Sequence, residues 1–325
     1  MSATLPLSPV APAIALDPRA TPPSDFEREL IAALSTRPRS VSPKFFYDAA
    51  GSRLFDRICD LPEYYPTRTE FGLLADHGPD MVSHFGDAAD LVEFGAGSLT
   101  KVRLLLDAWE RPGRFIPVDI SAEHLQQSAA QLRAEYPGLE VLPVAADFTR
   151  PLPLPAAARR VGFFPGSSIG NLGPEAAVRF LRQAAQSLPG GGLLVGVDLV
   201  KEPATLHRAN NDAAGVTAAF NRNLLARANR ELGADFDLDA FDHYAFYDPR
   251  LQRIEMHLVS RRAQTVSVGD QTFDFAQGES LHTENSHKYT LEGFRQMARR
   301  AGFTPGPAWV DENQLFSVHW LATGS

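Results

Sequence analysis

Cysteine is almost absent from this chain, which has one cysteine among 325 residues. A single thiol rules out an internal disulfide framework and fits a reducing compartment. Cys59 lies in the stretch LFDRICDL, between apolar neighbours. This setting favours a buried structural thiol over a nucleophile.

Long apolar runs are also missing, since no stretch approaches the roughly 18 residues that a membrane-spanning helix needs. The first residues lack the basic start and continuous apolar core of a signal peptide. Residues 1–22 are rich in Ala, Pro and Ser, and we expect them to form a disordered tail. The sequence therefore predicts a cytoplasmic protein without a membrane partner.

Excess positive charge is the third absence, because the net charge is −8 and the pI is about 5.6. An acidic surface repels phosphate backbones, so we expect no nucleic-acid partner. Apolar residues make up 44% of the chain and charged residues 22%, which is enough for a sizeable core and too little charge for wholesale disorder. We expect a monomer that binds a small molecule.

Strand and helix patterns alternate through the middle of the chain. Strands at this spacing, each followed by a helix, predict a parallel sheet covered on both faces and an α/β fold. The expected strands are 89–97, which runs into a glycine-rich turn, 114–120, 139–148, 161–171, which ends in a loop, and 191–200. The expected helices are 99–109, 121–136 and 175–188.

The pattern changes after residue 201. A long helix is expected over 211–232, followed by alternating residues over 254–260 and a hairpin that joins 263–268 to 271–275. These elements predict an inserted α+β lobe over the ligand edge of the sheet. We assign residues 23–68 plus 201–288 to a substrate-binding lobe, and residues 69–200 plus 289–325 to the sheet domain.

A glycine pair marks the end of the first strand. Gly95 and Gly97 follow Glu93 and would let the backbone approach a ligand closely. A nicotinamide-cofactor fingerprint requires a third glycine where this chain has Thr100, which weakens that interpretation. A glycine pair alone also occurs in purely structural turns.

Acidic residues close the next two expected strands. Asp119 lies about 20 residues after the glycine turn, where a carboxylate can accept hydrogen bonds from ribose hydroxyls. Asp147 can accept from an adenine amino group, and Phe148 can stack on the base. Helix capping or turn formation is the structural alternative for both acids. Three successive strands thus end in a glycine pair, an aspartate and an Asp-Phe pair. This order matches the layout of class I methyltransferases.

Several longer stretches make the chain resemble one family. PKFFYDAAGSRLFDRICDLPEYYPTRTE, FIPVDIS, GSSIGNL, NDAAGVTAAFNRN, RELGADFDLDAF, RIEM and HTENS are similar to the histidine Nα-methyltransferases of ergothioneine biosynthesis. With the glycine turn, they extend from about residue 43 to the C-terminus. The resemblance implies a Rossmann-like sheet that binds S-adenosylmethionine, an inserted substrate lobe, and three successive methyl transfers to the α-amine of L-histidine.

The resemblance also implies roles for individual residues. Tyr64, Glu284 and Ser286 would hold the imidazole, and Met256 would line the side-chain pocket. Tyr47 and Asn171 would hold the amine and carboxylate end, and they are the expected catalytic residues. The expected cofactor residues are Glu93, Gly95, Gly97, Lys101, Asp119, Asp147 and Phe148.

One position departs from the family pattern, which has tyrosine where this chain has Asn210. The shorter amide can still donate a hydrogen bond to a substrate carboxylate, directly or through water. This departure keeps open a methyltransferase of another amino acid or small amine. A non-catalytic protein that binds the cofactor and histidine is the alternative from another class. No metal is expected, because the spacing from His282 to His287 does not match a helical zinc motif.

Overall fold

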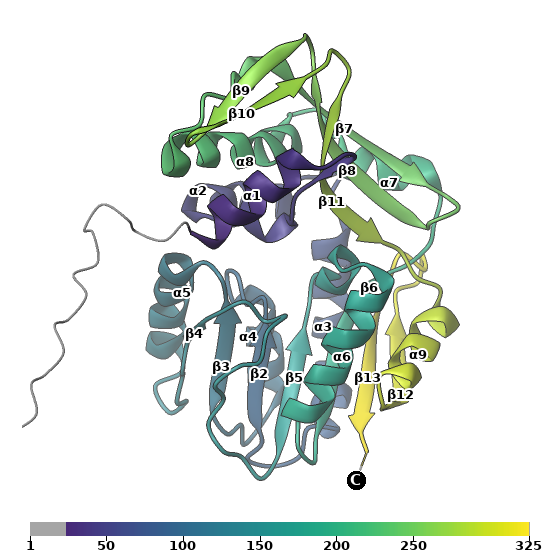
Figure 1. Ribbon diagram of the computed structural model, residues 1–325. Coiled ribbons are helices and arrows are strands. Elements are labelled where there is room, and N and C mark those ends of the chain that lie inside the picture. Colours follow the sequence, from purple (N-terminus) through teal and green to yellow (C-terminus); the bar gives the residue numbers. More distant parts are fainter. Residues whose placement is uncertain (1–23, 325) are drawn as a thin grey trace, which may run out of the picture.

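The computed structural model describes residues 24–324, so the tail expected over 1–22 lies outside the described residues. A large sheet domain lies below a smaller lobe in Figure 1. Segments from the start and the later middle of the chain meet in the upper lobe, with α1 beside the hairpin of β9 and β10.

The sheet domain contains a seven-stranded sheet in the order β12-β13-β6-β5-β2-β3-β4. Its five strands from β2 to β6 are parallel, whereas β13 runs antiparallel to both β6 and β12. The strands are β2 (Asp90–Phe94), β3 (Phe115–Asp119), β4 (Val144–Ala145), β5 (Arg160–Phe164), β6 (Gly192–Asp198), β12 (Phe303–Val310) and β13 (Phe316–Thr323). Their apolar runs are buried because helices cover both faces.

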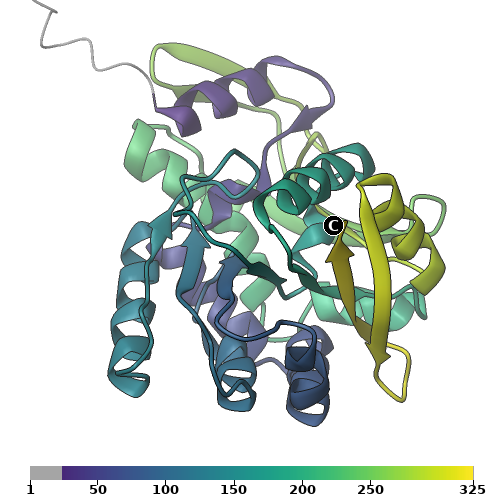
Figure 2. The ribbon, with the colours of Figure 1, turned by 90° about the horizontal axis from the view of Figure 1, so that it is seen from below.

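Two sets of helices cover this sheet, one on each side, as Figure 2 shows from below. One face packs against α3 (Tyr65–Ser83), α4 (Thr100–Ala108) and α5 (Ala122–Glu135). The other packs against α6 (Pro174–Ser187) and α9 (Leu291–Arg300). This arrangement confirms the predicted α/β fold with a largely parallel sheet.

The upper lobe has its own sheet and its own apolar core. Four strands lie in the order β1-β11-β8-β7, and β9 with β10 forms the expected hairpin. The strands are β1 (Arg39–Ser40), β7 (Phe241–Asp248), β8 (Arg253–Ser260), β9 (Gln264–Val268), β10 (Gln271–Phe275) and β11 (Ser280–His287). The α-helices are α1 (Asp25–Ser35), α2 (Ala49–Cys59), α7 (Pro203–Asn210) and α8 (Val216–Leu232), with the short 3₁₀ turns η1 (Pro43–Phe46) and η3 (Leu238–Ala240).

The prediction of a long helix over 211–232 is wrong at its start. α8 begins only at Val216, because Gly215 adopts a left-handed φ of +71°. The carboxylate of Asp212 accepts hydrogen bonds from the backbone N–H groups of Val216 and Thr217. Asp212 therefore serves the free donors of the first turn, as a capping residue does.

Two further expectations are corrected near proline residues. The strand expected over 139–148 is reduced to β4, because Pro143 has no N–H for the ladder. The prolines of residues 61–70 predict a restricted loop. This segment is not a loop throughout, since α3 starts at Tyr65 with Pro66 in its first turn. α3 thus begins before the boundary expected at residue 68, and the division into two lobes stays a prediction.

None of the helices found in residues 24–324 is both long and apolar enough to cross a membrane.

Candidate active site

A cavity of about 890 Å³ lies where β2, β3 and β5 end beneath the upper lobe, a size typical of small-molecule sites. A smaller pocket of about 70 Å³ extends from it into the upper lobe. The two share wall residues from both lobes: Tyr47, Phe55, Tyr64, Pro66, Gly166, Ser168 and Asn171. A ligand in the large cavity can therefore contact a ligand in the small one.

The predicted glycine turn forms one wall of the large cavity. Gly95 and Gly97 have left-handed φ values of +71° and +49°, which side chains other than glycine rarely adopt. A Cβ at Gly95 would lie 3.5 Å from the ring of Phe148, and nothing lies within 4 Å of one at Gly97. The turn thus leaves the backbone open to a ligand.

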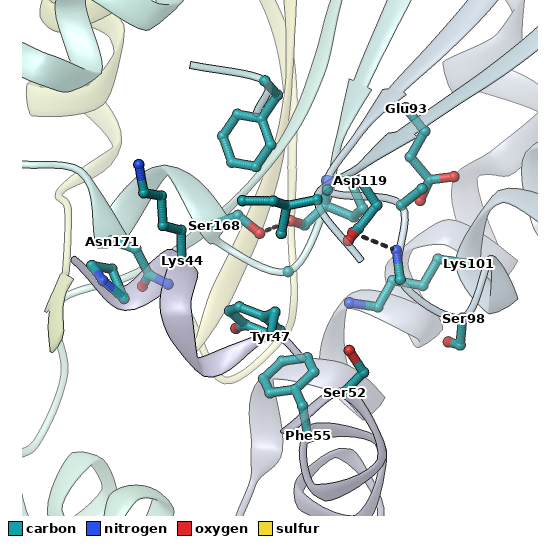
Figure 3. A pocket seen from close by; sticks show the side chains of 18 of the residues that line it. Lys44, Tyr47, Ser52, Phe55, Glu93, Ser98, Lys101, Asp119, Ser168 and Asn171 are labelled. Atoms are coloured by element: carbon teal, nitrogen blue, oxygen red, sulfur yellow. Dashed lines mark hydrogen bonds between the residues drawn. The ribbon is translucent and has the colours of Figure 1, made fainter. Parts of the chain in front are cut away.

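Asp119 lies at the carboxyl end of β3 and faces the same cavity. Its carboxylate accepts hydrogen bonds from the backbone N–H groups of Gly97 (3.2 Å) and Ser121 (2.8 Å). Burial nevertheless raises the pKa of this carboxyl group. In Figure 3, Asp119 and the pair Tyr47 and Phe55 approach the hollow from opposite sides.

Asp147 and Phe148 border the cavity beyond Asp119. One oxygen of Asp147 is engaged by the backbone N–H and the hydroxyl of Thr149, at 3.0 and 2.5 Å. The other oxygen lies 3.5 Å from the ammonium group of Lys44. Although partial burial would raise the pKa of Asp147, the hydrogen bonds from Thr149 and the nearby cations Lys44 and Arg150 hold that pKa below its usual value.

A buried carboxylate and a lysine stand on the floor of the cavity. Glu93 is 1% exposed, and within the described residues its Oε2 atom has no hydrogen-bond partner. Burial raises its pKa well above the usual range. Lys101 donates to Glu70 over 2.5 Å, and Glu70 also accepts from the backbone N–H of Gly166. Glu93 has a buried oxygen without a partner, and Lys101 is held nearby by Glu70. Together they fit a ligand that carries both an ammonium and a carboxylate group.

The small pocket ends at β11. A register shift in β11 between His282 and Glu284 places Glu284 opposite Met256 and Ser286 opposite Ile254. Both polar side chains therefore reach the inner face of the sheet, where they line the pocket with Met256. Burial raises the pKa of Glu284 to about 7.

Aromatic side chains form the remaining walls. The rings of Tyr47 and Phe55 lie 5.7 Å apart, and Phe55 and Tyr64 lie 6.3 Å apart, each pair edge to face. Burial, followed by nearby acidic groups, raises the pKa of Tyr47 far above its usual range. Tyr47 is therefore a neutral phenol at physiological pH.

Asn210 also lines the small pocket, at the end of α7. Its side-chain nitrogen donates to the backbone carbonyl of Leu206 over 2.9 Å. One of its two donor hydrogens is thus directed along the helix, and the other can face a ligand.

A separate cluster lies on the outer face of the upper sheet. Glu255, His257 and His282 offer ligand atoms within 4.8 Å of one another. Arg253 donates to Glu255 over 2.6 Å and supplies the positive charge that a cation would bring. The expectation that the chain holds no metal stays a prediction.

The pattern of residues across the whole chain decides the family. Residues 26–323 match the family described as histidine-specific, SAM-dependent methyltransferases. The chain belongs to this family. Membership confirms the resemblance inferred from the sequence, the enzyme class and S-adenosylmethionine as the cofactor.

Two of the curated relatives share most of their length with this family member. The chain is 48% identical to a histidine N-alpha-methyltransferase of Mycolicibacterium smegmatis over 87% of its residues and 90% of the relative. It is 44% identical to the enzyme of that name from Mycobacterium tuberculosis over 91% of this chain and 94% of the relative. Ergothioneine biosynthesis protein 1 of Neurospora crassa is 28% identical over 88% of this chain, which spans 33% of that protein.

The structure of this family member gathers every predicted site residue around the two connected pockets. It adds residues that the sequence did not single out: Phe55 in the shared wall, Glu70 under Lys101, and Lys288 with Asp198 behind Ser286. Glu70 stands in the quoted stretch EYYPTRTE, and Lys288 follows HTENS by two positions. Their position within or directly beside the stretches that carry the family resemblance was the available signal for both.

Proposed function

We propose that the chain transfers three methyl groups in succession from S-adenosylmethionine to the α-amine of L-histidine. One observation carries the proposal: Glu284 and Ser286 stand side by side at the end of a pocket that opens into the cavity of Gly95 and Asp119. A carboxylate and a hydroxyl can bind an imidazole by its two ring nitrogens, one as donor and one as acceptor. The trimethylated product would serve ergothioneine synthesis, the pathway in the name of the fungal relative.

Residues of the large cavity would hold the cofactor. Asp119 would accept hydrogen bonds from the ribose hydroxyls, while Asp147 and Phe148 would contact the adenine. The free oxygen of Glu93 would meet the ammonium of the methionine part, and Lys101 its carboxylate. The cofactor supplies an activated methyl group when it is bound.

Residues of the small pocket would hold the amino acid. Tyr64, Glu284 and Ser286 surround the imidazole position, with Met256 beside it. Tyr47 and Asn171 line both pockets, so they can hold the amine and carboxylate end where the two ligands meet. Orientation of the amine toward the large cavity is then the main contribution of the protein to the reaction.

The amine must lose its proton before it can be methylated. Apolar and aromatic walls disfavour the ammonium form, which lowers the pKa of a bound amine. Tyr47 stays neutral, so it cannot act as a preformed phenolate base. We assign it the role of a relay: its hydroxyl oxygen accepts a proton from the amine while its hydroxyl hydrogen passes to a solvent water.

Tyr47→Phe tests this relay. We expect the rate of the first methyl transfer to fall by about 100-fold, as loss of acid–base help does, with a much smaller change in histidine affinity. Single-turnover mass spectrometry measures the rate, and calorimetry measures the affinity. Tyr244→Phe is the control, because Tyr244 is 53% exposed and outside both pockets. An unchanged first-transfer rate in Tyr47→Phe would rule the relay out.

The stoichiometry of the reaction tests the proposed function. Purified protein with excess S-adenosylmethionine should convert histidine through species with one and two added methyl groups to one with three. Three molecules of S-adenosylhomocysteine should form for each histidine consumed. A reaction that stops after one methyl group would contradict the proposal of trimethylation, and no methylation would contradict the proposed activity.

We also infer that the enzyme works as a cytoplasmic monomer that binds no nucleic acid. The net charge of −8 supports the absence of a nucleic-acid partner, because an acidic surface repels phosphate backbones. Light scattering at working concentration would test the oligomeric state, and a dimer would contradict it.

A further inference from the structure

A chain of charged groups lies directly behind Ser286. Lys288 is 5% exposed and follows β11, and its ammonium donates to the hydroxyl oxygen of Ser286 over 2.6 Å. The same ammonium lies 2.7 Å from one carboxylate oxygen of Asp198, which is 1% exposed. Lys201 pairs with the other oxygen over 2.5 Å, and the hydroxyl of Tyr65 donates to Asp198 over 2.8 Å. Asp198 thus holds the ammonium of Lys288 in place while Lys288 donates to Ser286.

This contact decides how Ser286 can hydrogen-bond. An ammonium group has only donors, so the oxygen of Ser286 must accept from Lys288. The hydroxyl hydrogen of Ser286 is then left to donate elsewhere. Because Ser286 lines the small pocket, a ligand there can accept that hydrogen.

We propose that Lys288 is a positioning residue that makes Ser286 a donor to the substrate, so that the pocket selects the neutral imidazole ring and rejects the imidazolium. This inference rests on the proposed function. One ring nitrogen accepts from Ser286, and the N–H of the other donates to Glu284. An imidazolium would direct a second N–H at the hydroxyl of Ser286, which already accepts from the ammonium of Lys288. The positive ring and the positive lysine would then repel each other.

The charge balance around the pocket supports this selection. A hydrogen bond from the ring N–H favours the ionised form of Glu284. With Glu284 ionised in this way, the carboxylates of Glu284 and Asp198 match the ammonium groups of Lys201 and Lys288, so a neutral ring leaves the buried cluster uncharged. A charged ring would add an unmatched cation, which is costly away from water. Lys288 also opposes the burial that raises the pKa of Glu284 to about 7. The other titratable groups near this cluster are Tyr47, Cys59, Tyr64, Tyr65, His287 and Asp311.

The protonation of the bound ring can be read directly. Histidine labelled with ¹⁵N in the ring is bound to the full chain with S-adenosylhomocysteine, which prevents turnover. The ¹⁵N NMR chemical shifts of the ring distinguish a neutral ring from an imidazolium. They are measured at about pH 6, below the ordinary histidine pKa of about 6.5. The wild-type complex should show one protonated and one unprotonated nitrogen, and the imidazolium signature would overturn the proposal.

Lys288→Met then tests the assigned residue. Without the ammonium, Ser286 can accept from the ring, so the ratio of charged to neutral bound ring should rise at least about tenfold, one unit of ring pKa. Lys288→Arg keeps a cationic donor and should restore the neutral ring. Lys201→Met is the matched control: it removes a cation from the same aspartate without touching Ser286, so only the charge balance changes and the ratio should rise much less than in Lys288→Met.

Each outcome has a definite meaning. A neutral ring in Lys288→Met would overturn the role of Lys288, and equal charging in Lys201→Met would show an effect of net charge alone. If Lys288→Met does not fold, the wild-type spectrum and Lys288→Arg still decide whether the neutral ring is selected. Wild-type protein that binds no histidine at any pH would refute the proposed function itself, a result distinct from binding of a charged ring.

Discussion

Glu284→Ala lowers kcat/KM for histidine by about 100-fold, because a hydrogen bond to a charged group, worth roughly 1.5–3 kcal/mol, is lost. The imidazole N–H would then be buried opposite a methyl group, without an acceptor. Initial rates with varied histidine measure the effect, and calorimetry with S-adenosylhomocysteine should show unchanged cofactor affinity.

Two controls separate recognition from folding in this experiment. Glu255→Ala removes the same side chain from the adjacent strand of the same sheet, on the opposite face, and should keep normal kinetics. Stability gives the second control. Folding raises the pKa of Glu284 to about 7. Above that pH the folded protein holds an ionised carboxylate in a buried site, which lowers its stability relative to the unfolded chain. At about pH 8, Glu284→Ala should therefore unfold at the wild-type temperature or higher. Normal histidine kinetics in this variant would remove Glu284 from the site.

Asp119→Ala weakens binding of S-adenosylhomocysteine by about 100-fold, because charge-assisted hydrogen bonds to the ribose hydroxyls are lost. The backbone N–H groups of Gly97 and Ser121 also lose their acceptor, which loosens the glycine turn. Calorimetry with the purified variant measures the change.

Asp147→Ala is the comparison for Asp119→Ala and should have a smaller effect. One oxygen of Asp147 is already occupied by Thr149, so less of its capacity remains for a ligand. Asp107→Ala changes an aspartate that accepts a hydrogen bond from Tyr136 and lies outside both pockets, and it should leave affinity unchanged. Cofactor affinity in Asp119→Ala equal to that of Asp107→Ala would contradict the proposed ribose contact.

The parallel part of the fold could be predicted because each buried strand is a short apolar run that ends in a turn of recognisable chemistry. Gly95, Asp119 and Asp147 meet at one edge since the carboxyl ends of parallel strands share that edge. Glu284 and Ser286 lie on one face because alternate residues of a strand point the same way.

Other features depend on contacts between distant parts of the chain, which a local pattern does not contain. β12 contains Pro305, Gly306 and Pro307, so it does not resemble a strand, yet it pairs with β13 at the sheet edge. The start of α8 depends on Asp212 reaching forward to two N–H groups. The contact of Lys288 with Ser286 and Asp198 joins β11 to β6, and only the assembled fold reveals it.

Competition among free amino acids tests the central claim most directly. The purified chain is given S-adenosylmethionine and an equal mixture of all the protein amino acids, and methylated products are identified by mass. The account predicts that histidine alone gains up to three methyl groups while the others stay unmodified. Preferential methylation of another amino acid, or binding of histidine and cofactor without turnover, would contradict it.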